Sequence, residues 1–141
     1  MAVLYLISSC FCFCGCENSQ SQVLAVSESQ VKLRSMQSRI FDTTDKIKTL
    51  RTAMATLQDL GFVIDKADDV LGSVSATKLE RYSVRITINI RPHGETQMLV
   101  RANAQYNLQA IEDPEPYQQF FSAFEKAMFL TAHNITGASG G

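Results

Sequence analysis

The chain has 141 residues, of which 13 are Lys or Arg and 14 are Asp or Glu, so its formal net charge is −1. This even balance excludes a protein that binds nucleic acid or anionic lipid through a strongly basic field. The length fits one domain, and the roughly 110 residues left after a leader and a linker can build a core without disulfide or metal staples.

The four cysteines all lie near the N-terminus, at Cys10, Cys12, Cys14 and Cys16. A domain held together by disulfides spreads its cysteines through the fold, so the folded part of this chain does not depend on them. The alternating spacing also suits a soft metal or an iron–sulfur cluster. Such sites need a folded frame for their ligands, which an apolar N-terminal segment does not supply. We therefore predict no metal and no cofactor here.

Residues 1–15 are uncharged and mostly apolar. A spanning helix needs about 20 apolar residues, so this segment is too short to cross a bilayer and has the length of a signal-peptide core. It ends in Phe13-Cys14-Gly15-Cys16, which resembles the lipobox of bacterial lipoproteins. The resemblance implies cleavage before Cys16 and acylation of its thiol. The segment departs from the usual pattern in Phe13 and in having no basic residue before the apolar run. The alternative is a buried N-terminal strand or helix of the domain.

Residues 16–30 are rich in Ser and Gln and contain no Gly. A segment of this composition buries too little apolar surface to order itself, which predicts a flexible tether behind the lipidated cysteine. Two or three acyl chains on Cys16 give stable membrane attachment. Glu17 occupies the position where an aspartate signals retention at the inner membrane. We therefore expect an outer-membrane anchor with the domain in the periplasm, and the inner membrane is not excluded.

A single folded domain is expected over residues 31–136, followed by a flexible tail at 137–141. Its first strand is predicted over 32–41. The next element is a helix over 46–60, because apolar residues recur there at helical spacing. Candidate N-cap residues precede this helix, and Gly61 follows it at the position of a left-handed C-cap. The apolar residues of the helix are Ile47, Leu50, Met54 and Leu57.

An extended segment is predicted to start at residues 62–65. A turn or bulge at 67–69 interrupts it, and the strand resumes over 70–78, where alternate residues are apolar. Gly72 within this stretch indicates a bend or a close approach of another backbone.

The clearest expected feature is a β-hairpin whose strands cover 82–91 and 98–106, with turn residues between them. Apolar and polar residues alternate along both strands. We predict the register that places Ile90 opposite Met98 and Tyr82 opposite Tyr106. A slip by one residue would set apolar side chains opposite polar ones along the ladder.

The last predicted element is a helix with an aromatic stripe, introduced by an acidic, proline-containing segment at 112–116. The stripe consists of Tyr117, Phe120, Phe121, Phe124, Ala127, Met128 and Thr131. Burial of its aromatic rings contributes roughly 1.5–3 kcal/mol each. The expected fold is therefore α+β with two layers. An antiparallel sheet of about four strands carries two helices on one face, in the order β-α-β-β-β-α.

Several short stretches between residues 36 and 133 resemble a family of small, largely uncharacterised proteobacterial lipoproteins. They are Arg39-Ile40-Phe41-Asp42-Thr43, Leu57-Gln58-Asp59-Leu60-Gly61-Phe62, Leu71-Gly72 and Ala76-Thr77-Lys78. The expected layout is also similar to the helix-grip domains of the lipoprotein C subunit of the outer-membrane β-barrel assembly machine. The resemblance implies an accessory or scaffolding lipoprotein that faces the periplasm and has no catalytic residues to carry over.

A search for catalytic chemistry finds little. The histidines, His93 and His133, have no third metal ligand nearby in the sequence. The three aspartates at 65, 68 and 69 lack the spacing of a calcium loop and are expected to form a solvated turn. No nucleophile elbow and no phosphate-binding glycine loop occurs. We predict that the protein is not an enzyme and that it has no small-molecule substrate.

Two surfaces are candidate partner sites. The polar face of the hairpin carries Arg85, Arg91 and Arg101, which suit an acidic partner or a glycan, although a solvated sheet face is the simpler reading. Phe129 and Leu130 widen the last helix's apolar stripe, either to cover the first strand or to dock a partner. The leading hypothesis is an envelope protein that binds another envelope protein. The alternative is a module that binds an envelope glycan or lipid.

Overall fold

The computed structural model describes residues 18–80 and 82–137, which contain three helices and six strands. The order along the chain is α1, β1, α2, β2, β3, β4, β5, β6 and α3. The helices are α1 (Asn18–Met36), α2 (Lys46–Asp59) and α3 (Glu115–Gly137). The strands are β1 (Ser38–Phe41), β2 (Val63–Asp68), β3 (Ser73–Leu79), β4 (Ser83–His93), β5 (Gln97–Tyr106) and β6 (Gln109–Ala110).

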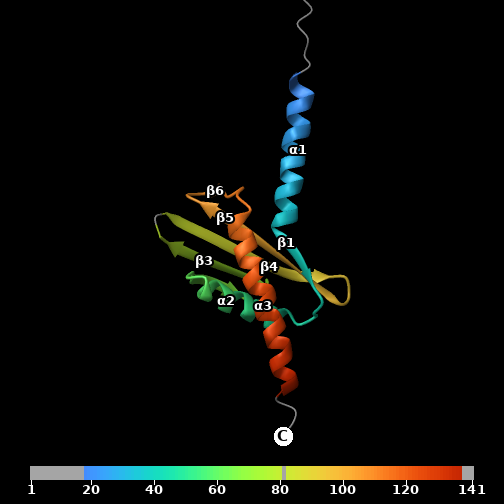
Figure 1. Ribbon diagram of the computed structural model, residues 1–141, viewed down its shortest axis with the longest axis vertical. Coiled ribbons are helices and arrows are strands. Elements are labelled where there is room, and N and C mark those ends of the chain that lie inside the picture. The colour runs from blue at the N-terminus through green and yellow to red at the C-terminus, as the bar shows by residue number, and fades with distance from the viewer. Residues whose placement is uncertain (1–17, 81, 138–141) are drawn as a thin grey trace, which may run out of the picture.

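All strands join one antiparallel sheet in the order β1-β5-β4-β3-β2, and β6 pairs with the far end of β5. Helices α2 and α3 lie across one face of this sheet, whereas α1 rises away from it (Figure 1). The α+β class and the antiparallel sheet are therefore confirmed. The expected numbers of strands and helices were wrong. β2 and β3 are separate strands, β6 adds a short strand, and α1 adds a third helix.

The segment expected as one interrupted strand is a hairpin. The Asp68 carboxylate accepts a hydrogen bond from the Leu71 backbone N–H at 2.8 Å, and Gly72 takes a φ of 68°. Together they close a turn over residues 69–72, so Val70 and Leu71 lie in that turn and are exposed. Period-two alternation misled the prediction here because it ran across the turn without a break.

Helix α1 replaces both the expected tether and half of the expected first strand. It runs from Asn18 to Met36, so the domain boundary expected at residue 30 falls inside a helix. The tether was predicted because the segment can bury little apolar surface. A helix, however, satisfies its backbone hydrogen bonds locally, and this segment has no Gly or Pro to interrupt it. Strand β1 is left with Ser38–Phe41.

Helix α2 is confirmed close to its predicted limits. The Asp45 side chain accepts from the Lys48 backbone N–H at 2.9 Å, and Gly61, at φ 85°, follows the helix end. Its buried face includes three threonines that the apolar pattern did not include, Thr49, Thr52 and Thr56. Each threonine hydroxyl donates to the backbone carbonyl four residues earlier, so these buried polar groups are satisfied.

The β4–β5 hairpin has its predicted faces but not its predicted register. Ile90 lies opposite Val100, not opposite Met98. The whole ladder is shifted by two residues, which keeps every side chain on its expected face. The strands continue to the pair His93↔Gln97, and the turn between them uses Gly94 at φ 64°. Turn geometry, which the alternation does not encode, decided the register.

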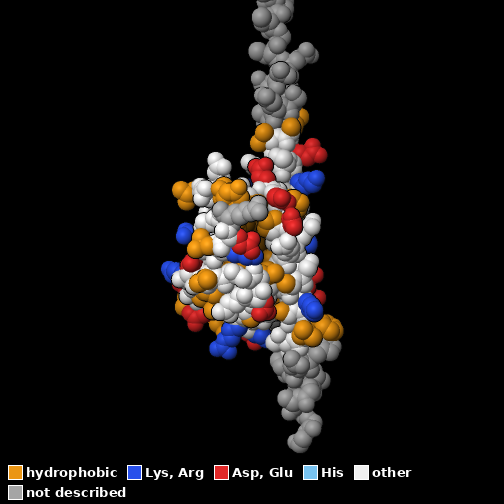
Figure 2. All heavy atoms as spheres, turned by 60° about the vertical axis from the view of Figure 1, so that its left-hand side comes forward, with side chains coloured by type: hydrophobic (Ala, Val, Ile, Leu, Met, Phe, Trp, Pro, Cys, Tyr) orange, Lys and Arg blue, Asp and Glu red, His pale blue; other side chains and the backbone are white. Residues whose placement is uncertain are grey.

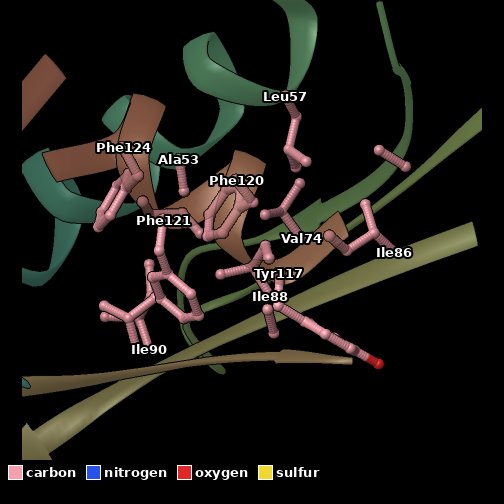
Figure 3. Packing of buried hydrophobic residues seen from close by; sticks show 14 of the residues in the cluster. Ala53, Leu57, Val74, Ile86, Ile88, Ile90, Tyr117, Phe120, Phe121 and Phe124 are labelled. Carbon is pink, nitrogen blue, oxygen red and sulfur yellow. The ribbon is translucent and has the colours of Figure 1, made fainter. Parts of the chain in front are cut away.

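The core lies between the sheet and the two covering helices. Figure 3 shows the rings of α3 directed at Ile86, Ile88 and Ile90 of β4 and at Ala53 and Leu57 of α2. The α3 rings Tyr117, Phe120, Phe121 and Phe124 are each no more than 1% exposed. The aromatic stripe predicted from the sequence therefore forms the core of the domain.

Strand β5 is completed by groups from outside the regular sheet. Strand β1 pairs with one end of β5 and β6 pairs with the other end. Between these two stretches, the backbone N–H of Ala102 donates to the Gln37 carbonyl at 2.8 Å. The N–H of Ala104 donates to the Tyr117 hydroxyl at 3.3 Å, and that hydroxyl donates to the Ile111 carbonyl at 2.7 Å. The Gln37 side-chain amide also donates to the Tyr117 hydroxyl, at 3.2 Å. One hydroxyl thus joins the end of α1, β5 and the start of α3.

Candidate binding surfaces

The sheet face opposite α2 and α3 is the main candidate. Along β3, β4 and β5, odd-numbered residues point away from the helices, because even-numbered residues such as Val74, Ile88 and Val100 are buried. We call these outward side chains the open face. The open face consists of Ser73, Ser75, Thr77, Leu79, Ser83, Arg85, Thr87, Asn89, Arg91, His93, Gln97, Leu99, Arg101, Asn103 and Gln105.

The three predicted arginines all lie on the open face and are exposed, but they do not form one cluster. Arg101 is opposite Asn89, and Arg91 is opposite Leu99. Arg91 and Arg101 are therefore diagonal neighbours, about 7–8 Å apart at the backbone. Asn89 is the residue opposite Arg101, and Arg85 lies four residues before it on β4. Arg85 is therefore about 13 Å away along the strand.

Arg85 differs from the other two arginines in having an acidic neighbour. Its Nε lies 4.0 Å from Oδ2 of Asp65 on β2, and the same carboxylate oxygen accepts from the Thr77 hydroxyl at 2.6 Å. Among the described residues, no carboxylate pairs with Arg91 or Arg101. The two arginines of the β4–β5 corner are thus available for a partner.

The distribution of charge sets the open face apart from the rest of the chain. Strands β3, β4 and β5 contain no Asp or Glu, although the whole chain has 14 acidic residues. Their outward positions carry Arg85, Arg91 and Arg101, whereas Lys78 lies on the helix side of the sheet. A protein with a net charge of −1 therefore presents one locally cationic, polar sheet face.

The second predicted surface is the C-terminal part of α3. Phe129 is 61% exposed and Leu130 is 50% exposed, so neither belongs to the core. Phe129 lines a groove of about 520 Å³ whose opposite wall includes Phe41 and Thr43, beside the edge strand β1. A groove of about 590 Å³ lies between α2 and α3. Figure 2 shows apolar side chains gathered where α3 extends beyond the rest of the domain.

A third apolar region was not identified from the sequence. At the end of the sheet where β3 meets β4, Leu79 is 79% and Tyr82 is 63% exposed, and beside them Leu108 is 89% exposed. Tyr82 packs edge-on against Tyr106 with ring centroids 5.1 Å apart. The predicted pairing of Tyr82 opposite Tyr106 was wrong, because Tyr106 pairs with Val84 in the ladder, but the two rings still meet at the end of the strands.

The described residues supply no group of side chains placed to hold a metal ion. Over residues 18–80 and 82–137, no three His, Cys, Asp or Glu side chains come together in a way that would hold a metal ion. His93 is exposed at the end of β4. The aspartates first considered for calcium have structural partners, since Asp65 binds Thr77 and Asp68 caps the turn at Leu71.

Cys16 lies outside the described residues, as do the expected signal peptide at 1–15 and most of the expected tail. The side chain of His133 is likewise outside the description. In the part of the chain that the structure covers, no helix is both long enough and apolar enough to cross a bilayer. No protein-family model matches the chain, and no curated protein sequence matches it.

Proposed function

We propose that this protein is a lipid-anchored accessory or scaffolding module of a bacterial envelope complex. In this proposal Cys16 carries the lipid at the outer membrane, residues 1–15 are the signal peptide, and the α+β domain stands in the periplasm and binds another envelope protein. The proposal continues the resemblance of residues 36–133 to small proteobacterial lipoproteins. It assigns the domain a binding role without catalysis.

The observation that carries the proposal is α1. This helix begins two residues after Cys16 and has 19 residues, which corresponds to a length of about 28 Å. Leu24, Val26 and Val31 are exposed, and the helix contributes to the core through Leu33 near its C-terminal end. A helix that leaves the domain in this way suits a stalk between a membrane anchor and a binding domain (Figure 1).

A stalk role explains an otherwise unusual helix. The polar and apolar residues of α1 are spread around its circumference, so it has no apolar stripe for a membrane surface or for a long core contact. Its C-terminal end is nevertheless held firmly, because the Gln37 backbone and side chain bind β5 and α3. In this proposal the C-terminal end of α1 sets the direction in which the stalk leaves the domain.

The second candidate function is recognition of an envelope glycan or lipid by the open face. The exposed arginines Arg85, Arg91 and Arg101, together with the asparagine and threonine side chains between them, favour it. The rings of Tyr117, Phe120, Phe121 and Phe124 lie in the core on the other side of the sheet, where they are not available to stack on sugars. The exposed rings of Tyr82 and Phe129 lie outside the open face.

The test of the anchor is the intact mass of the full chain extracted from bacterial membranes, beside the variants Cys16→Ser and Cys12→Ser. We expect the parent protein and Cys12→Ser to begin at Cys16 and to carry the mass of acyl chains. Cys16→Ser should lose that mass and leave the membrane fraction. An unmodified parent chain that retains residues 1–15 would refute the lipoprotein proposal.

A further inference from the structure

We infer that the corner of the open face formed by Arg91 and Arg101 docks an acidic segment of a partner protein. The inference rests on the proposed binding role and specifies the chemistry of the partner. It starts from the absence of any Asp or Glu in β3, β4 and β5 and from the presence of two exposed arginines that no described carboxylate neutralises.

Two other cations, Arg39 and Lys78, pair with carboxylates of this chain. Arg39 lies over the Phe121 ring and pairs with Glu125 at 3.5 Å. Lys78 pairs with Glu80 at 2.8 Å. Arg91 and Arg101 have no such partner in the described part of the chain, yet their positions are set by two long, fully paired strands.

The geometry of the corner suits carboxylates. Guanidinium groups bind carboxylates in a two-pronged arrangement, with stronger hydrogen bonds than neutral donors make. Arg91 and Arg101 are diagonal neighbours, so acidic side chains about 7–8 Å apart on one partner segment would meet both. Asn89 and Asn103 lie beside them on the same face and can bind the partner's backbone.

The shape of the surface argues for a macromolecule. Small ligands are held in concave, mostly apolar pockets, whereas neither Arg91 nor Arg101 lines any of the grooves described above. The outward positions of β3, β4 and β5 carry no Phe, Tyr or Trp, and their one ring is the imidazole of His93 at the end of β4. A cationic face without the larger aromatic side chains favours an acidic protein segment over a glycan.

The inference is tested by equilibrium binding of the full chain, purified in an uncharged detergent, to three probes. These are a peptide of repeated Glu-Gly-Ser units, its Gln-Gly-Ser counterpart and a polyuronate oligosaccharide. The variant pair Arg91→Gln/Arg101→Gln is compared with Arg51→Gln/Lys126→Gln. The control pair removes the same charge from exposed positions on α2 and α3, in the helix layer.

We expect the acidic peptide to bind and its neutral counterpart not to bind. Loss of two charge-assisted contacts should weaken binding of the acidic peptide by about tenfold or more in the open-face variant, and by less than about twofold in the control. The reversal Arg91→Glu/Arg101→Glu should bind a Lys-Gly-Ser peptide instead. Urea unfolding of each variant should match the parent, because the substituted side chains are exposed.

Three results would overturn the inference. Equal losses in the open-face and control variants would show a general effect of net charge. Tighter binding of the polyuronate than of the acidic peptide would assign the face to a glycan. Unchanged binding in the open-face variant would place the contact elsewhere. Repeating the peptide-binding measurement with Cys16→Ser tests the docking inference independently of the proposed lipid anchor, because peptide binding should persist without the lipid.

Discussion

At the residue scale, the Tyr117 hydroxyl links three parts of the fold through hydrogen bonds. It accepts hydrogen bonds from the Gln37 amide and the Ala104 backbone N–H and donates to the Ile111 carbonyl. Tyr117→Phe keeps the ring and removes all three bonds. A buried group without its partner costs about 1–3 kcal/mol, so we expect the free energy of unfolding to fall by about 2 kcal/mol.

Urea denaturation followed by circular dichroism measures this loss, and Tyr82→Phe is the matched control. Tyr82 is 63% exposed, so removal of its hydroxyl should change the stability by less than about 0.5 kcal/mol. If both variants lose the same stability, the hydroxyl of Tyr117 contributes no more than an exposed one.

Two glycines with similar backbone angles allow steric conflict to be separated from backbone strain. A Cβ on Gly72 would lie 2.4 Å from the Ile90 carbonyl oxygen, whereas a Cβ on Gly94 would meet open space. The strand contact at Gly72 includes a hydrogen bond from the Ile90 N–H to the Gly72 carbonyl at 2.7 Å. Alanine at either position also has to adopt a positive φ.

We expect Gly94→Ala to destabilise the protein by about 1 kcal/mol through its backbone conformation alone. Gly72→Ala should cost about 3 kcal/mol, because the backbone contact with β4 must also shift. Thermal unfolding of the two variants measures the difference. Equal losses would contradict the close approach of Gly72 to β4.

Leu108 occupies a turn position that favours glycine. Asn107 and Leu108 have φ values of 44° and 72° and connect the pair Tyr106↔Gln109, which is the arrangement of a type I′ turn. A left-handed conformation costs a side-chain-bearing residue about 1–2 kcal/mol, and the Leu108 side chain is 89% exposed.

Leu108→Gly should therefore raise the free energy of unfolding by about 1 kcal/mol, whereas Leu108→Ala should leave it nearly unchanged. Chemical denaturation of both variants provides the measurement. A loss of stability in the glycine variant would mean that the leucine side chain is held by contacts that outweigh the strain of its backbone.

At the scale of elements, α1 and α3 illustrate two ways of forming a helix. Helix α3 packs its aromatic rings into the core, so its stability comes from tertiary contacts. Helix α1 mixes helix-favouring residues with Ser, Val and Asn, which favour helices less, and it has little tertiary support before Leu33. Most helical stability in proteins comes from tertiary packing, so the part of α1 before Leu33 is weakly stabilised.

We therefore expect the backbone amides of residues 20–30 to exchange with solvent about 100-fold faster, or more, than those of residues 120–128. Hydrogen exchange of the full chain in detergent, read by mass spectrometry of peptic fragments, makes the comparison. Equal protection of the two segments would show that another surface covers α1, and would change its role from stalk to interface.

The β4–β5 hairpin shows how far a strand pattern can be trusted. Alternation assigned each side chain to its face, which is why the arginines and the isoleucines were placed on opposite sides of the sheet. A shift of two residues preserves that alternation, so the pattern could not choose between the predicted and the observed registers. The prediction of an arginine-bearing face did not depend on the register, but the diagonal pairing of Arg91 with Arg101 did.

For the whole molecule, the architecture explains where a partner can bind. The helices α2 and α3 cover one face of the sheet, and α1 leaves the domain near the β1 edge (Figure 1). The opposite face keeps its polar outward side chains and its positive charge. In the proposed arrangement, a partner on the open face meets a surface set by the central strands, and α1 separates that surface from the proposed lipid anchor.

The sequence by itself determined the features that depend on neighbouring residues. Helices α2 and α3, an N-cap in the segment before α2, the aromatic core and the two faces of the hairpin all follow from local periodicity and capping. The tertiary structure alone decided the hairpin register, the separation of β2 from β3 and the closure of β5 by Gln37 and Tyr117. These features depend on turn geometry and on contacts between residues far apart in the chain, and no local pattern of polar and apolar residues encodes such contacts.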